Sequence, residues 1–361
     1  MGRFSWLAMM HLMDDDQKTG AGVEPFNSIC ACHVAIVTPV LDDWKSFAKL
    51  LGKISDQFSG GTVAFHVVAV DDGSAIPFDS QSLVLRSSSC IVELSVLMLA
   101  LNLGHQRAIA AGLCALVDRT DIDAVIVMDS DGEDRPEDVA TLLAASRTHP
   151  ADIILARRME RSETRAFKIG YLMYRLLFRL LTGRTINFGN FSLIPFASLQ
   201  RLVHLPDLWN NLAAALLRSR MRYITVATRR GVRYFDQPRM KLTALIIHGL
   251  SAVSVYIDVV FVRILIAAGA ISGTSLLAIA AVATIRFATD LAIPGWATIM
   301  AGDLAIVLLL TIVLVVVTAL MMLSSRSSLP IVPVRDYRSF VLRMIAVEQL
   351  AVPAELSRDE L

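Results

Sequence analysis

The chain has 361 residues, of which 55% are apolar and 19% charged, and its formal net charge is +1. A near-neutral chain lacks the basic excess of nucleic-acid-binding proteins, so we expect no nucleic-acid partner. The apolar excess is uneven: residues 1–240 carry charges at ordinary density, whereas residues 242–323 are almost free of them. This asymmetry predicts a globular part followed by a membrane part.

Residues 1–30 are expected to form a loose or surface-lying extension. Their apolar stretch, residues 4–13, is interrupted by three aspartates and lacks the basic start and cleavage site of a signal peptide. The four cysteines do not have zinc-finger spacing, so we expect reduced packing residues in a cytosol-facing domain; they are Cys30, Cys32, Cys90 and Cys114.

Two apolar strands and an intervening helix open the globular part. Residues 33–40 predict a strand, residues 42–58 a helix with one apolar face, and residues 63–70 a second strand. This order is typical of a parallel, doubly wound sheet. Ligands of such sheets bind at the carboxyl ends of the strands, where Asp71, Asp72, Gly73 and Ser74 follow the second strand.

A weaker strand is expected near residues 92–97, followed by the stretch Asn102-Leu103-Gly104-His105-Gln106. The helix predicted from residue 106 to residue 117 carries small residues that would let it press against the sheet. Residues 125–128 then predict a buried strand. A helix ending near residue 147 and a strand over residues 152–156 complete this half.

Four carboxylates follow the buried strand within six positions, namely Asp129, Asp131, Glu133 and Asp134. Carboxylates this close repel one another, so they require a positive partner or must spread into water. Positions two apart on an extended strand end point the same way, so Asp129 and Asp131 can converge on Mg²⁺ or Mn²⁺. The alternative is an acidic loop that caps the helix beginning near Pro136.

Four motifs together carry a family resemblance. They are P-V at the end of the first strand, D-D-G-S after the second, N-L-G-H-Q-x-A-x-x-A-G-L before the buried strand, and D-x-D-x-E-D-x-P-E after it. The chain resembles glycosyltransferase family 2, and most of all the polyprenyl-phosphate glycosyltransferases, the group that includes dolichol-phosphate mannose synthase. The resemblance implies a GT-A fold of class α/β, with a doubly wound, mostly parallel sheet.

The resemblance also implies roles for single residues. Asp71 and Asp72 would hydrogen-bond the donor's base or ribose, while Asp129 and Asp131 would bind the metal and the donor diphosphate. Further residues expected at the donor are Pro39, Asn102, His105 and Gln106. The residues expected to take part in the reaction are Asp131, Asp134 and Asn190.

Two of these assignments have plain structural alternatives. The acidic pair before Gly73 also fits an Asx-type turn with that glycine at positive φ. His105 also fits an ordinary loop histidine without a direct catalytic role.

From Arg157 the chain turns basic. Arg158 and Arg161 match the family's R-x-x-R, where guanidinium groups would meet phosphates of the donor or the lipid. The ordinary explanation is a solvated basic face that favours anionic headgroups. The helix predicted over residues 165–182 mixes arginines with large apolar residues and suits a membrane surface.

Residues 188–193 depart from the family pattern. Where these enzymes read G-D-F-R-L, this chain has Asn190 for the acid and Ser192 for the arginine. An amide cannot take up a proton at neutral pH, although an ionised phosphate acceptor has no need of a base. A catalytically inactive membrane scaffold that binds lipid or a partner enzyme therefore stays open as an alternative.

The last third predicts membrane attachment. The basic residues of the run 229–233, together with Arg239 and Lys241, are candidates for gripping the lipid phosphate, ahead of an interfacial region at residues 236–258. Residues 264–283 and 304–323 are charge-free runs long enough to span a bilayer, with Trp296 as an interface anchor. Basic residues outside both runs put the two ends in the cytoplasm.

These features give the expected domain order. It is an extension at 1–30, a GT-A domain at 31–235, the interfacial region, two transmembrane helices within 259–325 and a cytoplasmic tail at 326–361. The function expected is that of an inverting, metal-dependent transferase in the inner membrane. It would move one sugar from a nucleotide sugar to a polyprenyl (undecaprenyl) phosphate, with homo-oligomerisation possible.

Overall fold

Strands β1 (His33–Val40), β2 (Ala64–Asp71) and β4 (Ala124–Val127) form the middle of one sheet in the computed structural model. The structure describes residues 33–79, 90–158, 165–235, 249–289, 295–327 and 329–347. Nearly every residue of the three strands is buried. Burial on both faces explains why their sequences are continuously apolar rather than alternating.

The sheet has eight strands in the order β7-β5-β6-β4-β1-β2-β3-β8. The outer strands are β3 (Ile91–Leu99), β5 (Ile153–Arg158), β6 (Ser192–Pro195), β7 (Tyr223–Thr228) and β8 (Val341–Ala346). Only β6 and β8 run against the others, since both pair antiparallel with their neighbours. The mixed, mostly parallel α/β sheet confirms the expected fold class.

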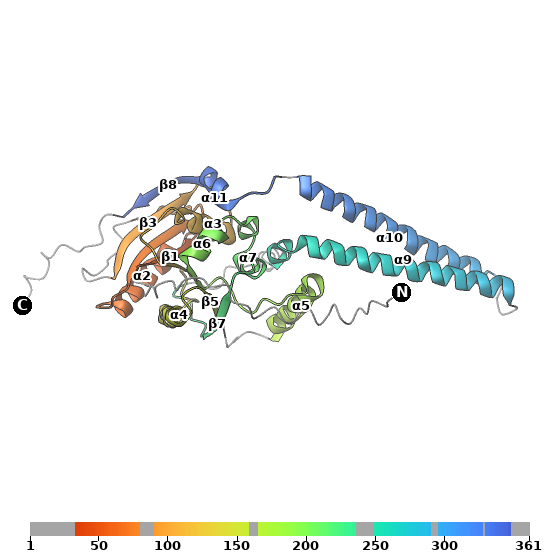
Figure 1. Ribbon diagram of the computed structural model, residues 1–361, viewed down its shortest axis with the longest axis horizontal. Coiled ribbons are helices and arrows are strands. Elements are labelled where there is room, and N and C mark those ends of the chain that lie inside the picture. The colour runs from red at the N-terminus through yellow and green to blue at the C-terminus, as the bar shows by residue number, and fades with distance from the viewer. Residues whose placement is uncertain are drawn as a thin grey trace, which may run out of the picture.

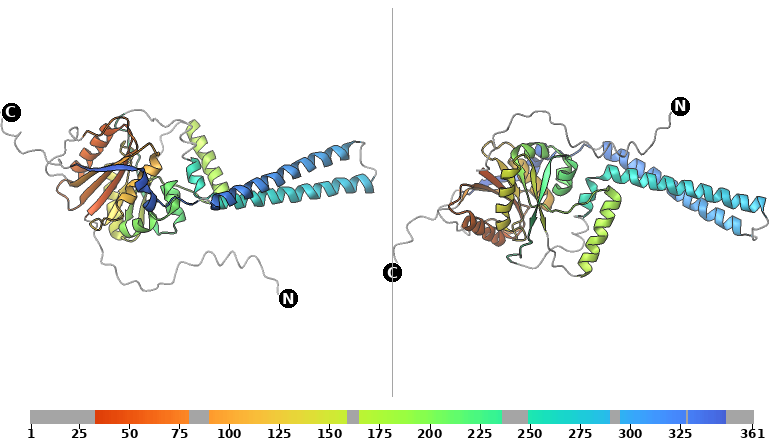
Figure 2. Two further views of the ribbon diagram at one scale, coloured as in Figure 1. Left: turned by 90° about the horizontal axis from the view of Figure 1, so that it is seen from above. Right: turned by 60° about the horizontal axis from the view of Figure 1, so that its bottom comes forward.

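Helices cover both faces of the sheet (Figure 2). Alternate strand residues separate into two cores: Val34 and Ile36 face α2 (Trp44–Phe58) and α4 (Pro136–Thr148). Ala35 and Val37 face the other layer, which contains α3 (His105–Ala115), α6 (Phe196–Leu202), η2 (Pro206–Trp209) and α7 (Leu212–Arg218). This layering leaves the carboxyl edge of the sheet to the loops.

The segment after the second long helix returns to the sheet. It forms α11 (Pro333–Asp336), η3 (Tyr337–Phe340) and β8, which pairs with the edge strand β3. The sequence predicted a separate tail here, and the structure corrects this for residues 333–346. The open edge of β3 offers unpaired backbone groups, which β8 satisfies.

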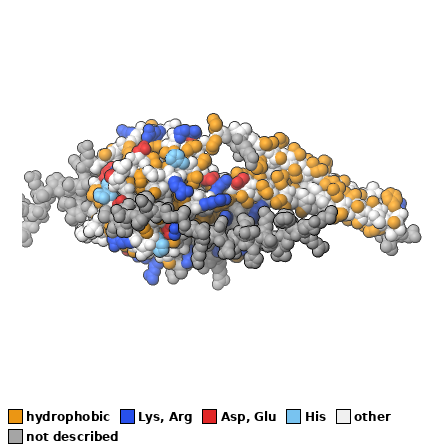
Figure 3. Space-filling view, in the orientation of Figure 1, with side chains coloured by type: hydrophobic (Ala, Val, Ile, Leu, Met, Phe, Trp, Pro, Cys, Tyr) orange, Lys and Arg blue, Asp and Glu red, His pale blue; other side chains and the backbone are white. Residues whose placement is uncertain are grey.

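Two long helices form a hairpin that projects from the sheet domain (Figure 1). They are α9 (Ile257–Ala288) and α10 (Trp296–Ser327), and both are long and apolar enough to cross a membrane by length and composition. Hydrophobic side chains dominate their visible surface (Figure 3). The predicted apolar runs lie inside these helices, while most of the predicted interfacial stretch falls outside the described residues.

Helix α5 (Arg165–Thr182) lies beside the start of α9. The Arg263 guanidinium of α9 donates to Leu180 O at 2.5 Å, where a cation also complements the negative end of the helix dipole. Five large apolar side chains of α5 are more than half exposed, namely Leu172, Met173, Leu176, Leu177 and Leu180. The amphipathic helix expected here is therefore present, with its apolar side chains uncovered.

Replacement of Gly112 tests how closely α3 approaches the sheet. A Cβ at this position would lie 2.5 Å from Val37 Cγ1 and 2.7 Å from Val70 Cγ2. We expect Gly112→Ala to destabilise the protein by about 1–3 kcal/mol, because two β-branched core side chains must shift. Gly52→Ala is the matched control: its Cβ would meet nothing within 4 Å, so helix propensity should make it slightly stabilising. Thermal unfolding of the detergent-solubilised chain measures both, and equal melting temperatures would contradict the close packing.

Candidate functional site

The acidic loop, residues 129–134, leaves the carboxyl end of β4 and is tied to itself by backbone hydrogen bonds. The backbone N–H of Asp129 donates to Asp134 Oδ2 at 2.9 Å, and that of Glu133 donates to Asp131 Oδ1 at 2.9 Å. Gly132 has φ +91°, a conformation that side chains rarely adopt. These bonds hold all four carboxylates in one tight turn.

Three arginines supply the positive charge that this loop requires. Arg158, at the end of β5, donates to Asp134 Oδ1 at 2.7 Å and to Glu133 Oε2 at 3.3 Å. Arg230 donates to Glu133 at 2.9 Å. Arg233 lies 2.8 Å from Asp131 Oδ2 and 3.1 Å from Glu133 Oε1.

The covering segment, residues 230–234, lies against the acidic loop through its backbone as well. The N–H of Gly231 donates to Glu133 O at 2.8 Å, and the N–H of Tyr234 donates to Asp131 O at 2.9 Å. A Cβ on Gly231 would lie 2.0 Å from Gly132 O, so only glycine allows this approach. From sequence we assigned the run 229–233 to a lipid phosphate, whereas the structure pairs Arg230 and Arg233 with the carboxylates.

His105, Gln106 and Asn190 form a second cluster beside the acidic loop. The Asn190 amide donates to His105 Nε2 at 3.0 Å and its oxygen accepts from Gln106 Nε2 at 3.1 Å. Gln106 Oε1 accepts from the backbone N–H of Leu212 at 2.9 Å, which orients the glutamine amide. The substituted Asn190 is therefore held on both sides by predicted site residues.

Asp129 is left with an unsatisfied oxygen. His105 Nε2 lies 3.3 Å from Asp129 Oδ1, but this nitrogen accepts a hydrogen bond from Asn190. Burial lowers the pKa of His105, although the charges of the nearby aspartates act to raise it. A neutral imidazole that accepts at Nε2 has no proton there for Asp129. Among the described residues, Asp129 Oδ1 is buried without a hydrogen-bond partner.

Burial and crowding shift the carboxyl groups away from their ordinary pKa values. Burial, with the charge of Asp131, raises the pKa of Asp129 to about 7. Burial, with the charge of Asp129, raises that of Asp134 to about 6, although Arg158 opposes the change. Burial also raises the pKa of Asp131, whereas hydrogen bonds from Arg230 and Arg233 outweigh burial and lower that of Glu133.

The acidic pair after β2 is engaged by its own backbone. Asp71 Oδ1 accepts from the N–H of Ser74 at 2.8 Å, and Gly73 has φ +75°. Asp72 accepts from the N–H groups of Leu103 at 2.7 Å and of Gly104 at 3.0 Å, just ahead of α3. The Asx-type turn weighed from the sequence is therefore present, and a donor-binding role stays a proposal.

The other predicted residues are distributed around the same edge. Ser130 Oγ donates to Pro39 O at 3.3 Å, which places the end of β1 beside the acidic loop. Asn102 is exposed, and its backbone lies close to Gly73. Arg161, Arg239 and Lys241 lie outside the described residues.

The carboxylate oxygens of the acidic loop suit a hard divalent cation that takes its remaining ligands from a bound substrate. In the part of the chain that the structure describes, no three His, Cys, Asp or Glu side chains converge on a ready-made metal site. Mg²⁺ often binds through one or two carboxylates together with substrate phosphates, and the unpartnered oxygen of Asp129 fits that use. Asp131 is the second candidate ligand once Arg233 releases it.

Comparison with known proteins identifies the domain that carries this site. A family model described as "Glycosyl transferase family 2" matches residues 35–209, which include β1, the acidic loop and Asn190. Residues 35–209 are a family 2 glycosyltransferase domain. The resemblance expected from the sequence motifs is confirmed.

Curated relatives match part of this domain. An undecaprenyl-phosphate 4-deoxy-4-formamido-L-arabinose transferase of Proteus mirabilis is 27% identical over 155 residues, covering 42% of this chain and 45% of that protein. The enzyme of the same name from Yersinia pestis (strain Pestoides F) is 24% identical over the same shares. The chain thus matches less than half the length of these relatives.

Solved structures of glucosyl-3-phosphoglycerate synthase from Mycobacterium tuberculosis also resemble the family 2 domain. The complex with Mn²⁺, UDP-glucose and phosphoglyceric acid has a TM-score of 0.46 at 15% identity and covers 64% of this chain and 81% of that one. The complex with Mg²⁺ and UDP has a TM-score of 0.44 at 14% identity, covering 64% and 80%. A likeness this distant does not inform the geometry of the site.

The raised pKa of Asp129 predicts how the metal-free protein responds to pH. Its folded pKa of about 7 lies above the ordinary 3.8, so its contribution to stability is full below pH 4 and is lost as pH rises through 7. Asp129→Asn does not suffer this loss. With EDTA present, we expect the melting temperature of Asp129→Asn minus that of wild type to increase by about 5 °C between pH 5 and pH 8, because only the wild type loses stability as pH rises.

Asp118→Asn is the control for this series, because Asp118 is exposed on the surface. Its melting temperature should differ from wild type by a constant amount across the same pH range. A constant difference for Asp129→Asn as well would contradict the electrostatic cost at the acidic loop.

Arg233 and a divalent cation compete for Asp131. We expect Arg233→Gln to tighten Mn²⁺ binding by about tenfold, because the cation no longer has to displace a guanidinium at 2.8 Å. Titration of free Mn²⁺ by electron paramagnetic resonance measures this. Arg229→Gln is the control, since Arg229 is exposed and adjoins the covering segment. Unchanged affinity in Arg233→Gln would show that Asp131 is not a ligand.

Proposed function

We propose that this chain is a membrane-bound glycosyltransferase that moves one sugar from a nucleotide sugar to a polyprenyl phosphate, such as undecaprenyl phosphate, on the cytoplasmic face. The acidic loop at the carboxyl end of β4, inside a family 2 domain, is the observation that carries the proposal. The names of the curated relatives support the acceptor class.

The donor would lie over the carboxyl edge of the sheet, where β1, β2 and β4 end together. Asp129 and Asp131 would hold Mg²⁺ or Mn²⁺, which would neutralise charge on the departing nucleoside diphosphate. Pro39, Asp71 and Asp72 line the neighbouring strand ends and would bound the nucleoside part of the donor.

The arginines would change partners when the donor binds. Arg233 and Arg158 now neutralise carboxylates, and a diphosphate entering the site would offer them a stronger, bidentate anion. The covering segment would have to move away from the acidic loop in that exchange. Donor binding and uncovering of the carboxylates would therefore be one event.

The acceptor would need no general base from the protein. Asn190 cannot take up a proton, but a phosphate monoester is ionised at neutral pH and attacks as it stands. The Asn190 amide is fixed between Gln106 and His105, whose Nε2 lies 3.3 Å from Asp129 Oδ1, so it would orient the acceptor phosphate by donating a hydrogen bond. Attack from the face opposite the diphosphate would invert the anomeric carbon.

The helical hairpin and α5 would place this site at the bilayer. Helices α9 and α10 would span it, and the uncovered leucines of α5 would lie in the headgroup region. The chain enters the hairpin from the domain and returns to it through β8, so both ends of the hairpin lie on the side of the domain. Basic residues at those ends favour the cytoplasmic side.

Transfer to a lipid phosphate tests the proposal directly. The purified chain in detergent, with undecaprenyl phosphate, Mn²⁺ and a panel of radiolabelled nucleotide sugars, should yield a lipid-soluble product with one donor. We expect Asp131→Asn to lower the rate at least about 100-fold, because half of the metal site is lost. Asp118→Asn should retain the wild-type rate.

Two outcomes would contradict this function. A failure of every donor to label the lipid, from folded protein, would favour the inactive scaffold that binds lipid or a partner enzyme. Full activity in Asp131→Asn would remove the metal-binding role of the acidic loop.

A further inference from the structure

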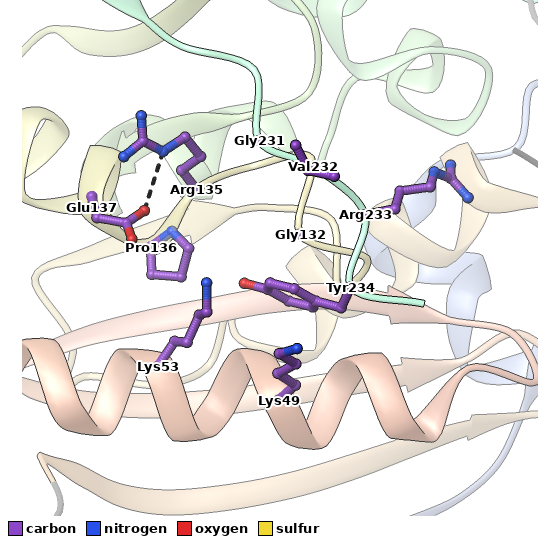
Figure 4. Close-up of a pocket in the computed structure, with 10 residues that line it drawn as sticks. All are labelled: Lys49, Lys53, Gly132, Arg135, Pro136, Glu137, Gly231, Val232, Arg233 and Tyr234. Carbon is purple, nitrogen blue, oxygen red and sulfur yellow. Dashed lines mark hydrogen bonds and ion pairs between the residues drawn. The ribbon is translucent and has the colours of Figure 1, made fainter. Parts of the chain in front are cut away.

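A cavity of about 380 Å³ lies on the other side of the covering segment, between that segment, the acidic loop and α2. Figure 4 shows Lys49 and Lys53 rising from α2 toward Tyr234, with Arg135, Pro136 and Glu137 on the opposite wall. We call this the lysine pocket. Helix α2 lies at the end of the domain away from the helical hairpin (Figure 1), so this wall of the pocket is distant from the helices proposed to span the bilayer.

The charges in the lysine pocket are not balanced. Glu137 is the one acidic residue among the described residues that line it, its Oε2 lies 3.2 Å from Arg135 Nε, and the charges of Arg135 and Lys53 help to lower its pKa. Arg233 is directed at Asp131. Four cationic side chains therefore line the pocket with a single carboxylate, which Lys53 shares with Arg135, so positive charge remains in excess.

Aromatic rings hold the ammonium groups in place. Lys49 Nζ lies 5.3 Å from the ring centre of Tyr234 and 5.0 Å from that of Phe235, and Lys53 Nζ lies 4.9 Å from the Tyr234 ring. Cation–π contacts orient a cation while leaving its hydrogen-bond donors unused. Two like charges converging on one ring repel each other unless an anion joins them.

A buried hydroxyl group without a hydrogen-bond partner also indicates that an anion can bind here. Tyr234 Oη is buried and has no hydrogen-bond partner among the described residues, and it is directed toward Lys53 (Figure 4). Burial raises the pKa of Tyr234 to about 12, so the hydroxyl keeps its proton at neutral pH. A buried hydroxyl without a partner is costly, and a small movement of the ring would let it donate to an anion held by the two lysines.

We propose that the lysine pocket binds a soluble anion that carries a phosphate or diphosphate group, held by Lys49, Lys53 and the Tyr234 hydroxyl. A phosphate group carries more negative charge than a carboxylate and has three strong acceptor oxygens, so it can accept from both lysines and the hydroxyl at once. The cavity volume is in the range of small-molecule sites and leaves room for a diphosphate. This site is separate from the carboxylates proposed to hold the donor's cation.

Calorimetric titration of the full chain with inorganic pyrophosphate in EDTA tests the proposal. EDTA removes the cation through which pyrophosphate would bind at Asp129 and Asp131. We expect Lys49→Gln with Lys53→Gln to weaken binding at least tenfold, and Lys45→Gln, on the same helix but outside the pocket, to bind as wild type. Glu137→Gln should tighten binding several-fold, a gain that misfolding cannot produce.

Three results would overturn the site. They are an absence of pyrophosphate binding to the wild-type chain, equal binding by the double lysine variant, and a loss of binding to phosphatidylglycerol vesicles in that variant while pyrophosphate binding is unchanged. The last would assign the lysines to lipid headgroups. Because the titration contains no donor, acceptor or metal, its outcome is independent of whether the chain transfers sugar.

Discussion

The mutual repulsion of four carboxylates at the end of β4 governs the architecture of this site. Burial, with the charge of Asp131, raises the pKa of Asp129 to about 7, and burial, with the charge of Asp129, raises that of Asp134 to about 6. The compensating guanidinium groups come from the end of β5 and from the segment after β7. Since β4, β5 and β7 run in the same direction, the sheet itself delivers these charges to one edge.

The same compensation conflicts with the chemistry that the carboxylates are proposed to perform. A cation and a diphosphate need the oxygens and guanidinium groups that are now paired with each other. The covering segment can approach the acidic loop only because residues 132 and 231 are glycines, since a side chain at either position would collide with the other segment. The unsatisfied oxygen of Asp129 marks the point where the compensation is incomplete. Functional sites commonly carry such local costs, which the surrounding fold offsets.

Attachment of the helical hairpin to the sheet is a second constraint on the site. The chain leaves the domain into α9 and returns from α10 into β8, which closes the edge of β3. Arg263 joins the start of α9 to the end of α5. Since β3 is next to β2, whose end carries Asp71 and Asp72, the hairpin is connected to the strand end proposed to bind the donor by a short path of paired strands.

Much of the fold was predictable because local patterns are strong in it. The continuous apolar strands and the small residues of α3 indicated the α/β class, and the boundaries of the elements predicted between residues 33 and 182 differ from the structure by one or two residues. Strands β6 and β7 and the helices between them were not predicted. The strand β8 was missed because its six residues are mostly exposed and lack a continuous apolar pattern. Its place depends on the free edge of β3, which lies some 240 residues earlier in the chain.

The sequence by itself determined that the carboxylates follow strand ends, and hence that they meet at one edge of the sheet, whereas Asn190 was placed there only by the family resemblance and reaches that edge because it precedes the antiparallel strand β6. Only the tertiary structure decided which groups are partners there. Spacing along a strand fixes the direction of a side chain, but the charge that balances it comes from a distant segment. Arg233 lies 102 residues from Asp131, and no local pattern could pair them. Long-range electrostatic compensation is a property of the folded chain.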